Sequence, residues 1–190
     1  MRRLMILGIV PLMLTMACGQ ANASDPPAAS AGVSSSPAAP PSRDAQIFAA
    51  VLRRYLTTPG ENANPRPSHV FVLDHADVDA ADPMRTTKSD QATPIPPADQ
   101  LAIAAAVRDV ATIRFIPSRD AVLQDRAGCP TVRDNGIAIL LGRPEPAGSE
   151  VHVGINGFAT CLGATWHTYV LAQRSGGWAV TGTVGPVAIS

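Results

Sequence analysis

The densest group of ionisable side chains in the sequence lies between residues 74 and 82. The side chains in this segment that could ligate a cation or move a proton are those of Asp74, His75, Asp77, Asp79 and Asp82. Hard cations prefer several carboxylate oxygens, and a loop at the end of a strand can bring such oxygens together. Zinc would need more His or Cys ligands than His75 alone provides. The segment therefore predicts either a site for a metal or another ligand, or a solvated acidic loop.

The segment does not have the pattern of an EF-hand calcium loop. In a loop that begins at Asp77, the fifth position is Ala81, which has no oxygen ligand in its side chain. The sixth position is Asp82, where the motif needs glycine, and the twelfth is Lys88, where it needs glutamate. Any metal loop here would be of a different type.

General acid–base catalysis is the second chemistry that these residue types allow. His152 and His167 fall in segments that we expect to be strands, and either could act together with a carboxylate of the 74–82 segment. The sequence contains no Gly-x-Ser-x-Gly elbow, phosphate-binding loop or dinucleotide fingerprint. A small enzyme outside the cytoplasm with an Asp/His site is thus one hypothesis. A binding module that is not an enzyme and needs no cofactor is the hypothesis that the sequence favours.

The cysteines indicate an oxidising compartment. Of the three cysteines, Cys129 and Cys161 are the pair that would remain in the mature domain. An isolated pair in an exported protein predicts a disulfide, which would close a loop of about 33 residues and contribute roughly 3–4 kcal/mol in the chain-entropy model. A catalytic thiol would need a base, and His167 follows Cys161 at a separation that fixes no geometry.

The first 17 residues have the organisation of an export signal. Arg2 and Arg3 form a short positive region, and residues 4–16 form an uncharged, mostly apolar stretch. As a helix this stretch would be about 20 Å long, which is too short for a hydrocarbon core of about 30 Å. We therefore expect residues 1–17 to be a cleaved signal peptide.

Two cleavage sites are possible. The run LTMAC that ends at Cys18 resembles the bacterial lipobox, in which a small residue precedes a cysteine that is acylated and becomes the new N-terminus; Thr15 stands where leucine is usual. This resemblance implies that Cys18 anchors the protein to the membrane through a lipid. The alternative is cleavage by ordinary signal peptidase after Ala23, which would give a freely secreted protein.

Residues 18–42 are expected to be a tether. Of the 19 residues from Ser24 to Ser42, 16 are Pro, Ala or Ser, a composition that cannot bury enough apolar surface to fold. The tether would span about 25 Å as a coil and about 60 Å as extended polyproline.

Without Arg2 and Arg3 the chain has 13 basic and 15 acidic residues, so no excess of positive charge favours binding to nucleic acid.

The residues from 43 onward are expected to form a single domain that begins with helices and short strands. Apolar residues recur at helical spacing from Ile47 to Leu56, with Ser42 or Asp44 as the N-cap. Residues 69–73 and 113–116 read as buried strands. Between them, Pro96-Pro97 begins a second helix, whose inward residues we expect to include Leu101, Ile103, Ala104 and Val107.

The last third of the sequence predicts strands throughout. Residues 137–141 are continuously apolar, and residues 151–156 alternate between apolar and other side chains. Residues 165–174 and 178–184 flank Ser175-Gly176-Gly177, which predicts a tight hairpin. Short connections require antiparallel neighbours. The fold class is therefore predicted to be α+β: a curved, mainly antiparallel sheet with two helices packed on one face, formed by residues 43–190.

This order of elements, ending in Gly177-Trp178-Ala179-Val180-Thr181-Gly182, resembles the nuclear-transport-factor-2-like and cystatin-like α+β folds. The whole chain also resembles a family of exported, lipoprotein-like proteins from high-GC Gram-positive bacteria. The resemblance implies a location outside the cytoplasm and a concave sheet, backed by helices, that could hold an apolar ligand. We expect the module to bind a small ligand or another envelope protein. It implies no catalytic residues.

Overall fold

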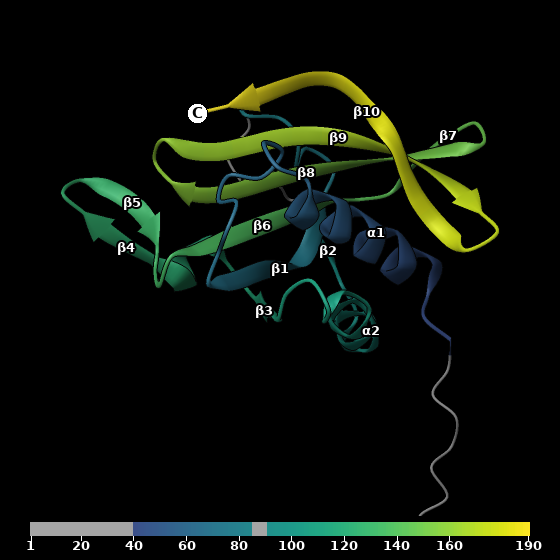
Figure 1. The fold of residues 1–190 in the computed structure, drawn as a ribbon, viewed down its shortest axis with the longest axis horizontal. Coiled ribbons are helices and arrows are strands. Elements are labelled where there is room, and N and C mark those ends of the chain that lie inside the picture. The colour runs from purple at the N-terminus through teal and green to yellow at the C-terminus, as the bar shows by residue number, and fades with distance from the viewer. Residues whose placement is uncertain (1–39, 85–90) are drawn as a thin grey trace, which may run out of the picture. The chain divides into compact units, whose positions relative to one another are not determined.

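A computed structural model describes residues 40–84 and 91–190. The predicted signal peptide, Cys18 and most of the predicted tether lie outside these residues. The described chain contains two α-helices, α1 (Arg43–Thr57) and α2 (Pro97–Val107), and a ten-stranded mixed sheet (Figure 1). The strands are β1 (His69–Asp77), β2 (Thr93–Pro94), β3 (Ile113–Ile116), β4 (Leu123–Arg126), β5 (Cys129–Val132), β6 (Gly136–Gly142), β7 (Glu145–Ala147), β8 (Glu150–Thr160), β9 (Gly163–Arg174) and β10 (Gly177–Ile189), with a short 3-10 helix, η1 (Arg119–Val122), before β4.

The sheet is open, and its main strand order is β10-β9-β8-β6-β1-β2. β6, β8, β9 and β10 pair antiparallel, whereas β1 runs parallel to both β6 and β3. The parallel pairing of β1 with β3 follows from the intervening helix α2, as in other strand–helix–strand units. The predicted α+β class and the mainly antiparallel curved sheet are confirmed.

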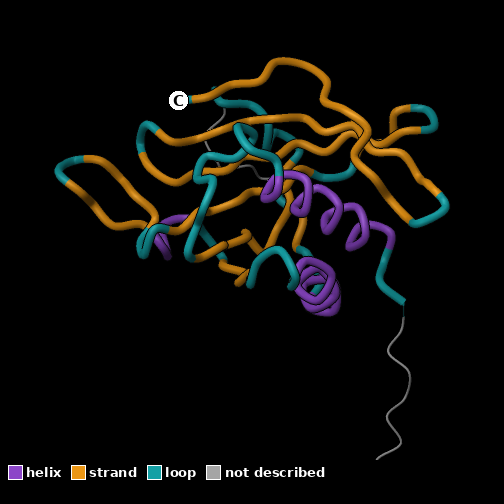
Figure 2. Tube along the Cα trace, viewed as in Figure 1, coloured by secondary structure: helices purple, strands orange, loops and turns teal. Residues whose placement is uncertain are grey.

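The larger core lies between the two helices and one face of the sheet, which we call the inner face. The helix α1 begins where Ser42 Oγ accepts a hydrogen bond from the N–H of Ala45 at 3.0 Å, so Ser42 is the N-cap and the other candidate, Asp44, lies in the first turn. The helices are neighbours, and in Figure 2 α1 runs across the view while α2 is seen end-on below it. Their buried side chains include Ile47, Val51 and Leu52 of α1 and Ile103 of α2, and these meet inward residues of β1, β6, β8 and β9.

The expectation that Leu101 faces inward is wrong, because its side chain is 75% exposed. Residues that are two positions apart on a helix are separated by about 200° around its axis, so Leu101 cannot share a face with Ile103. Ile103 and Val107, four residues apart, form the buried stripe of α2.

The opposite, outer face of β1 and β6 carries a smaller core. It contains Phe71, Leu73, Ile116, Val122, Val132, Ala138 and Leu140, and η1 and the β4–β5 hairpin contribute to it. Strands that are buried on both faces of a sheet have continuous runs of apolar residues in the sequence. This is why residues 70–73 and 137–141 show no alternation in the sequence.

Two further predictions about the β-rich part are confirmed. β9 and β10 form an antiparallel hairpin through the turn at Ser175–Gly177, where Gly177 has a left-handed φ of 113°. Cys129 of β5 is disulfide-bonded to Cys161, in the turn between β8 and β9, with a Cα–Cα distance of 5.5 Å. Within residues 40–84 and 91–190, no helix is long and apolar enough to cross a membrane.

Candidate functional site

The predicted acidic segment forms the end of β1 and the turn that follows it. The Asp74 carboxylate lies 3.0 Å from Nδ1 of His75. Asp77 Oδ1 accepts the N–H of Asp79 at 3.2 Å, and Asp82 Oδ1 accepts the N–H of Met84 at 2.8 Å, so these carboxylates stabilise the turn. Among the residues that the structure describes, no group of three or more His, Cys, Asp or Glu side chains could hold a metal ion.

His152 and His167 lie on opposite faces of the sheet. His152 is half-buried on the outer face of β8. His167 is on the inner face of β9, where it is only 3% exposed, and its Nε2 lies 2.7 Å from the backbone carbonyl oxygen of Glu61. His167 is therefore positioned against the segment after α1 and not against the acidic turn.

A polar network that sequence reasoning missed surrounds Glu61. Its carboxylate accepts two hydrogen bonds from the guanidinium of Arg54, at 2.5 and 3.1 Å, and one from the hydroxyl of Tyr169 at 2.6 Å. Beside it, the hydroxyl of Tyr55 is 2.7 Å from Thr165 Oγ1 and accepts the N–H of Ala63 at 3.1 Å. The network fastens the segment after α1 to the inner face of β9.

The network lowers the pKa of the Glu61 carboxyl and raises the pKa of the Tyr169 phenol. Burial acts to raise the pKa of the Glu61 carboxyl, but the hydrogen bonds from Arg54 and Tyr169 outweigh it, and the pKa lies below its ordinary value. Burial, reinforced by the hydrogen bond to Glu61, raises the pKa of the Tyr169 phenol. At neutral pH, Glu61 is thus ionised and Tyr169 is neutral and donates its proton.

We predict that Glu61→Gln destabilises the domain at pH 7 and that the difference from wild type shrinks as the pH falls. A carboxyl with a depressed folded-state pKa contributes stability above its unfolded pKa of about 4.3 and loses that contribution as pH falls through the folded-state value. Urea unfolding of both proteins at pH 7, 5 and 3 measures the difference. A difference that stays constant with pH would contradict this role of the Glu61 charge.

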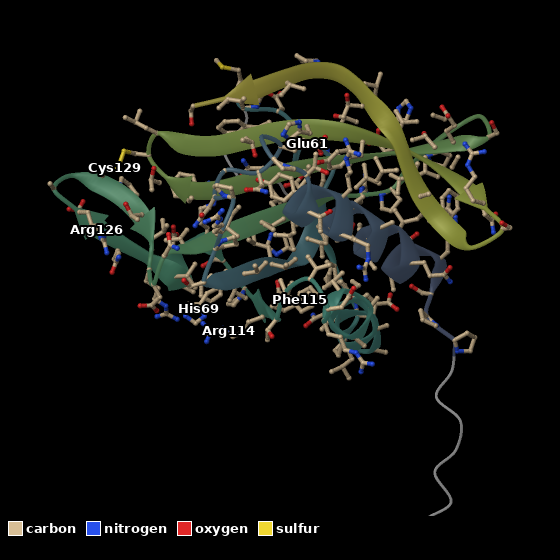
Figure 3. The ribbon with its side chains drawn as sticks, in the orientation of Figure 1. Glu61, His69, Arg114, Phe115, Arg126 and Cys129 are labelled. Carbon is tan, nitrogen blue, oxygen red and sulfur yellow. A yellow bond between two sulfur atoms is a disulfide. The ribbon has the colours of Figure 1, made fainter. Side chains whose placement is uncertain are left out.

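A cationic groove of about 680 Å³ opens at the edge of the sheet where β1 and β3 begin. Figure 3 shows His69 and Arg114 beside each other at this end of the two strands. The guanidinium carbon of Arg114 is 4.9 Å from the centroid of the Phe71 ring, and that of Arg133 is 5.9 Å from the same centroid. The imidazole of His69 stacks on this ring, with 6.1 Å between centroids. We call these four residues the Phe71 cluster.

Strand register brings the members of the Phe71 cluster together. Phe71 is directly opposite Arg114 in the parallel pairing of β1 with β3. His69 lies two residues earlier on the same face of β1, since side chains alternate along a strand. Arg133 comes from the turn before β6, on the other side of β1 from β3.

The turn that carries Arg133 is held by the segment before β1. Asp134 and Asn135 adopt left-handed φ angles of 57° and 50°, a conformation that Asp and Asn tolerate better than most residues. The carbonyl oxygen of Asn135 accepts the N–H of Ser68 at 3.0 Å, and its side-chain amide donates to the carbonyl of Arg66 at 3.2 Å. These contacts fix one wall of the groove.

The charges of the Phe71 cluster are not neutralised by ion pairs. Across the described chain, neither Arg114 nor Arg133 has a carboxylate oxygen within 4.0 Å. Asp134 also lines the groove, so the lining carries two guanidinium groups and one carboxylate. The groove can therefore accept an anion, and arginine is the side chain best suited to bind carboxylate or phosphate oxygens in pairs.

A second groove, of about 720 Å³, lies between the start of α1, the start of α2 and residues 143–146. Its apolar lining includes Phe48, Ala76 and Ile95. Its charged lining residues are Arg43, Asp44, Asp99, Arg143 and Glu145. Positive and negative groups are nearly balanced there, so its charge does not select a class of ligand.

Comparisons with known proteins provide no functional assignment, so any assignment depends on the side chains described above. No protein-family model, curated protein or solved structure was found to match this chain.

Proposed function

We propose that this protein is an exported, lipid-anchored binding module of the cell envelope that holds an anionic ligand in the groove of the Phe71 cluster. One observation carries the choice of ligand. The guanidinium groups of Arg114 and Arg133 both lie within 6 Å of the Phe71 ring centroid, and neither has a carboxylate partner in the described chain.

Two like charges that flank one ring repel each other, and their repulsion is relieved when an anion binds between or beside them. The two arginines also cover the Phe71 ring, but this contact contributes little to the stability of the fold. A solvent-exposed cation–π contact is worth only about 0.5–1 kcal/mol. A neutral or aliphatic side chain could cover the ring equally well. The positive charge itself is what an anionic ligand would use, and oxyanions such as phosphate and carboxylate have suitable acceptors.

We expect Arg114→Gln and Arg133→Gln each to weaken the binding of inorganic phosphate or succinate by about tenfold or more, since a hydrogen bond to a charged group contributes roughly 1.5–3 kcal/mol. Titration followed by arginine side-chain ¹⁵N NMR, at constant ionic strength, measures the affinity. Comparing phosphate with succinate distinguishes a phosphate ligand from a carboxylate ligand.

Arg126→Gln is the matched control, because it removes the same charge from the exposed β4–β5 hairpin, away from His69 and Arg114 (Figure 3). This variant should bind like the wild type. If Arg126→Gln weakens binding as much as Arg114→Gln, the effect is one of overall charge and the site is wrong. Equal affinity in the wild type and in all three arginine variants would also overturn the proposal.

The lipid anchor is supported by the lipobox-like run that ends at Cys18 and by the tether composition of residues 24–42. The intact mass of the protein from its native host tests it. A chain that begins at Cys18 and carries acyl groups is the expected result. A chain that begins at Ser24 without lipid would instead make the binding module a secreted protein.

A further inference from the structure

Arg119 also lacks a carboxylate partner within the described residues, and its side chain is half-buried. It lies in η1, on the outer face of the sheet, where one guanidinium amino group, Nη2, donates to Asn156 Oδ1 of β8. The guanidinium carbon is 4.8 Å from the centroid of the Phe158 ring. Its Nε is buried and has no hydrogen-bond partner in the described structure.

A charged guanidinium in this position is unfavourable without a counter-ion. Desolvation lowers the pKa of Arg119, and the nearest acidic group that acts on it is that of its exposed neighbour Asp120. No carboxylate oxygen of the described residues lies within 4.0 Å of the guanidinium. An anion that reached this group would supply the missing counter-ion and offset the unfavourable desolvation of the guanidinium.

The surroundings of Arg119 hold its side chain in place. Asn156 is only 2% exposed, and its amide nitrogen donates to the carbonyl oxygen of Thr165 at 3.1 Å, which directs the amide oxygen toward Arg119. Within the described residues, the third guanidinium nitrogen, Nη1, donates no hydrogen bond, so its N–H groups remain available to an anion.

Apolar ring surface lies next to this guanidinium. Asn156 pairs directly with Trp166 across the β8–β9 ladder, and residues that pair directly project from the same face of a sheet. The Trp166 side chain is half-buried there, and Phe158 lies under the guanidinium. The guanidinium of Arg119 and the half-buried indole of Trp166 would together suit an anion that also has an apolar ring.

We propose that Arg119, with Asn156, Phe158 and Trp166, forms a second binding site on the outer face of the sheet, which takes the carboxylate of a small aromatic acid. The carboxylate oxygens accept hydrogen bonds from the guanidinium, and the ring packs on the indole of Trp166. This site is separate from the groove of the Phe71 cluster and does not depend on the function proposed for it.

The test uses benzoate as the probe and the fluorescence of Trp166 as the signal. The chain has two tryptophans, so a Trp178→Phe background leaves Trp166 as the only indole. We expect a saturable change in fluorescence with benzoate, after correction for its quenching of a free tryptophan analogue. Arg119→Met in this background should weaken the response at least tenfold, whereas Arg114→Gln should change it less than twofold.

Arg119→Met retains most of the side-chain volume and is expected to fold, because removal of an unpaired, half-buried charge offsets the loss of the donor to Asn156 Oδ1. Urea unfolding with and without benzoate gives a second readout, in which benzoate should stabilise the Arg119 protein but not the Met variant. An equal response in both proteins, or none in either, would overturn the proposal. Equal binding of benzyl alcohol would exclude recognition of the carboxylate, and equal binding of phosphate would exclude recognition of the ring.

Discussion

Gly157→Ala is expected to destabilise the domain by about 3–5 kcal/mol, the sum of overpacking and of a disrupted buried hydroxyl. A Cβ added to Gly157 in β8 would lie 1.7 Å from the hydroxyl oxygen and 2.6 Å from Cζ of Tyr55. Tyr55 is fully buried in the inner core, so its ring cannot swing into solvent. Its displacement would also break the hydrogen bonds to Thr165 and Ala63 that fasten the segment after α1.

Urea unfolding of Gly157→Ala and of the control Gly182→Ala measures this effect. Gly182 is also a strand glycine, but a Cβ there would have no atom within 4 Å, so its replacement should change stability by less than about 1 kcal/mol. The penalty of Gly157→Ala should be smaller in a Tyr55→Phe background, because the nearest clashing atom is gone. Equal penalties for the two glycines would show that Tyr55 and Gly157 do not approach each other as described.

Loss of the disulfide has the second largest expected effect. The bond joins β5 to the turn between β8 and β9, across a sequence separation of 32 residues. Closing a loop of this length stabilises a protein by roughly 3–4 kcal/mol in the chain-entropy model. We therefore expect the Cys129→Ser/Cys161→Ser variant to lose about that much stability, with unchanged secondary structure at low denaturant.

Reduction of the wild type should lower its stability to that of the double serine variant, and the reductant should leave the variant itself unaffected. Hydrogen exchange should speed up most in β4 and β5, because this hairpin is paired to β8 through a single register position, Thr131 with Thr160. A variant as stable as the wild type would contradict the assigned contribution of the disulfide.

Local sequence patterns were sufficient to predict those parts of the fold that depend only on residues close together in the chain. Helical spacing identified α1, with Ser42 as one of two candidate caps, and the Ser175–Gly177 turn identified the β9–β10 hairpin. The α+β class followed from such patterns, and the disulfide followed from cysteine count and expected compartment. The burial of Leu101 was predicted wrongly because α2 is apolar on more than one side, so its sequence does not indicate which side meets α1.

The chemistry that the structure brings together depends on residues that are far apart in the sequence. The acidic segment at residues 74–82 was conspicuous because its carboxylates are neighbours along the chain, whereas three of those side chains cap or brace local contacts in the structure. Glu61 meets Tyr169 only because the segment after α1 lies on β9. Phe71, Arg114 and Arg133 meet only because β1 lies between β3 and β6 in one particular register.

The classes of element, the disulfide pair and the expectation of export could be predicted without the structure, since each depends on local periodicity, composition or cysteine count. Which charges lack partners became visible only in the folded chain. Whether an arginine is paired depends on every side chain within about 4 Å of it, and strand order and register set those distances. For this reason Arg119 and the Phe71 cluster, which carry the binding proposals, could not be distinguished in the sequence from the other arginines.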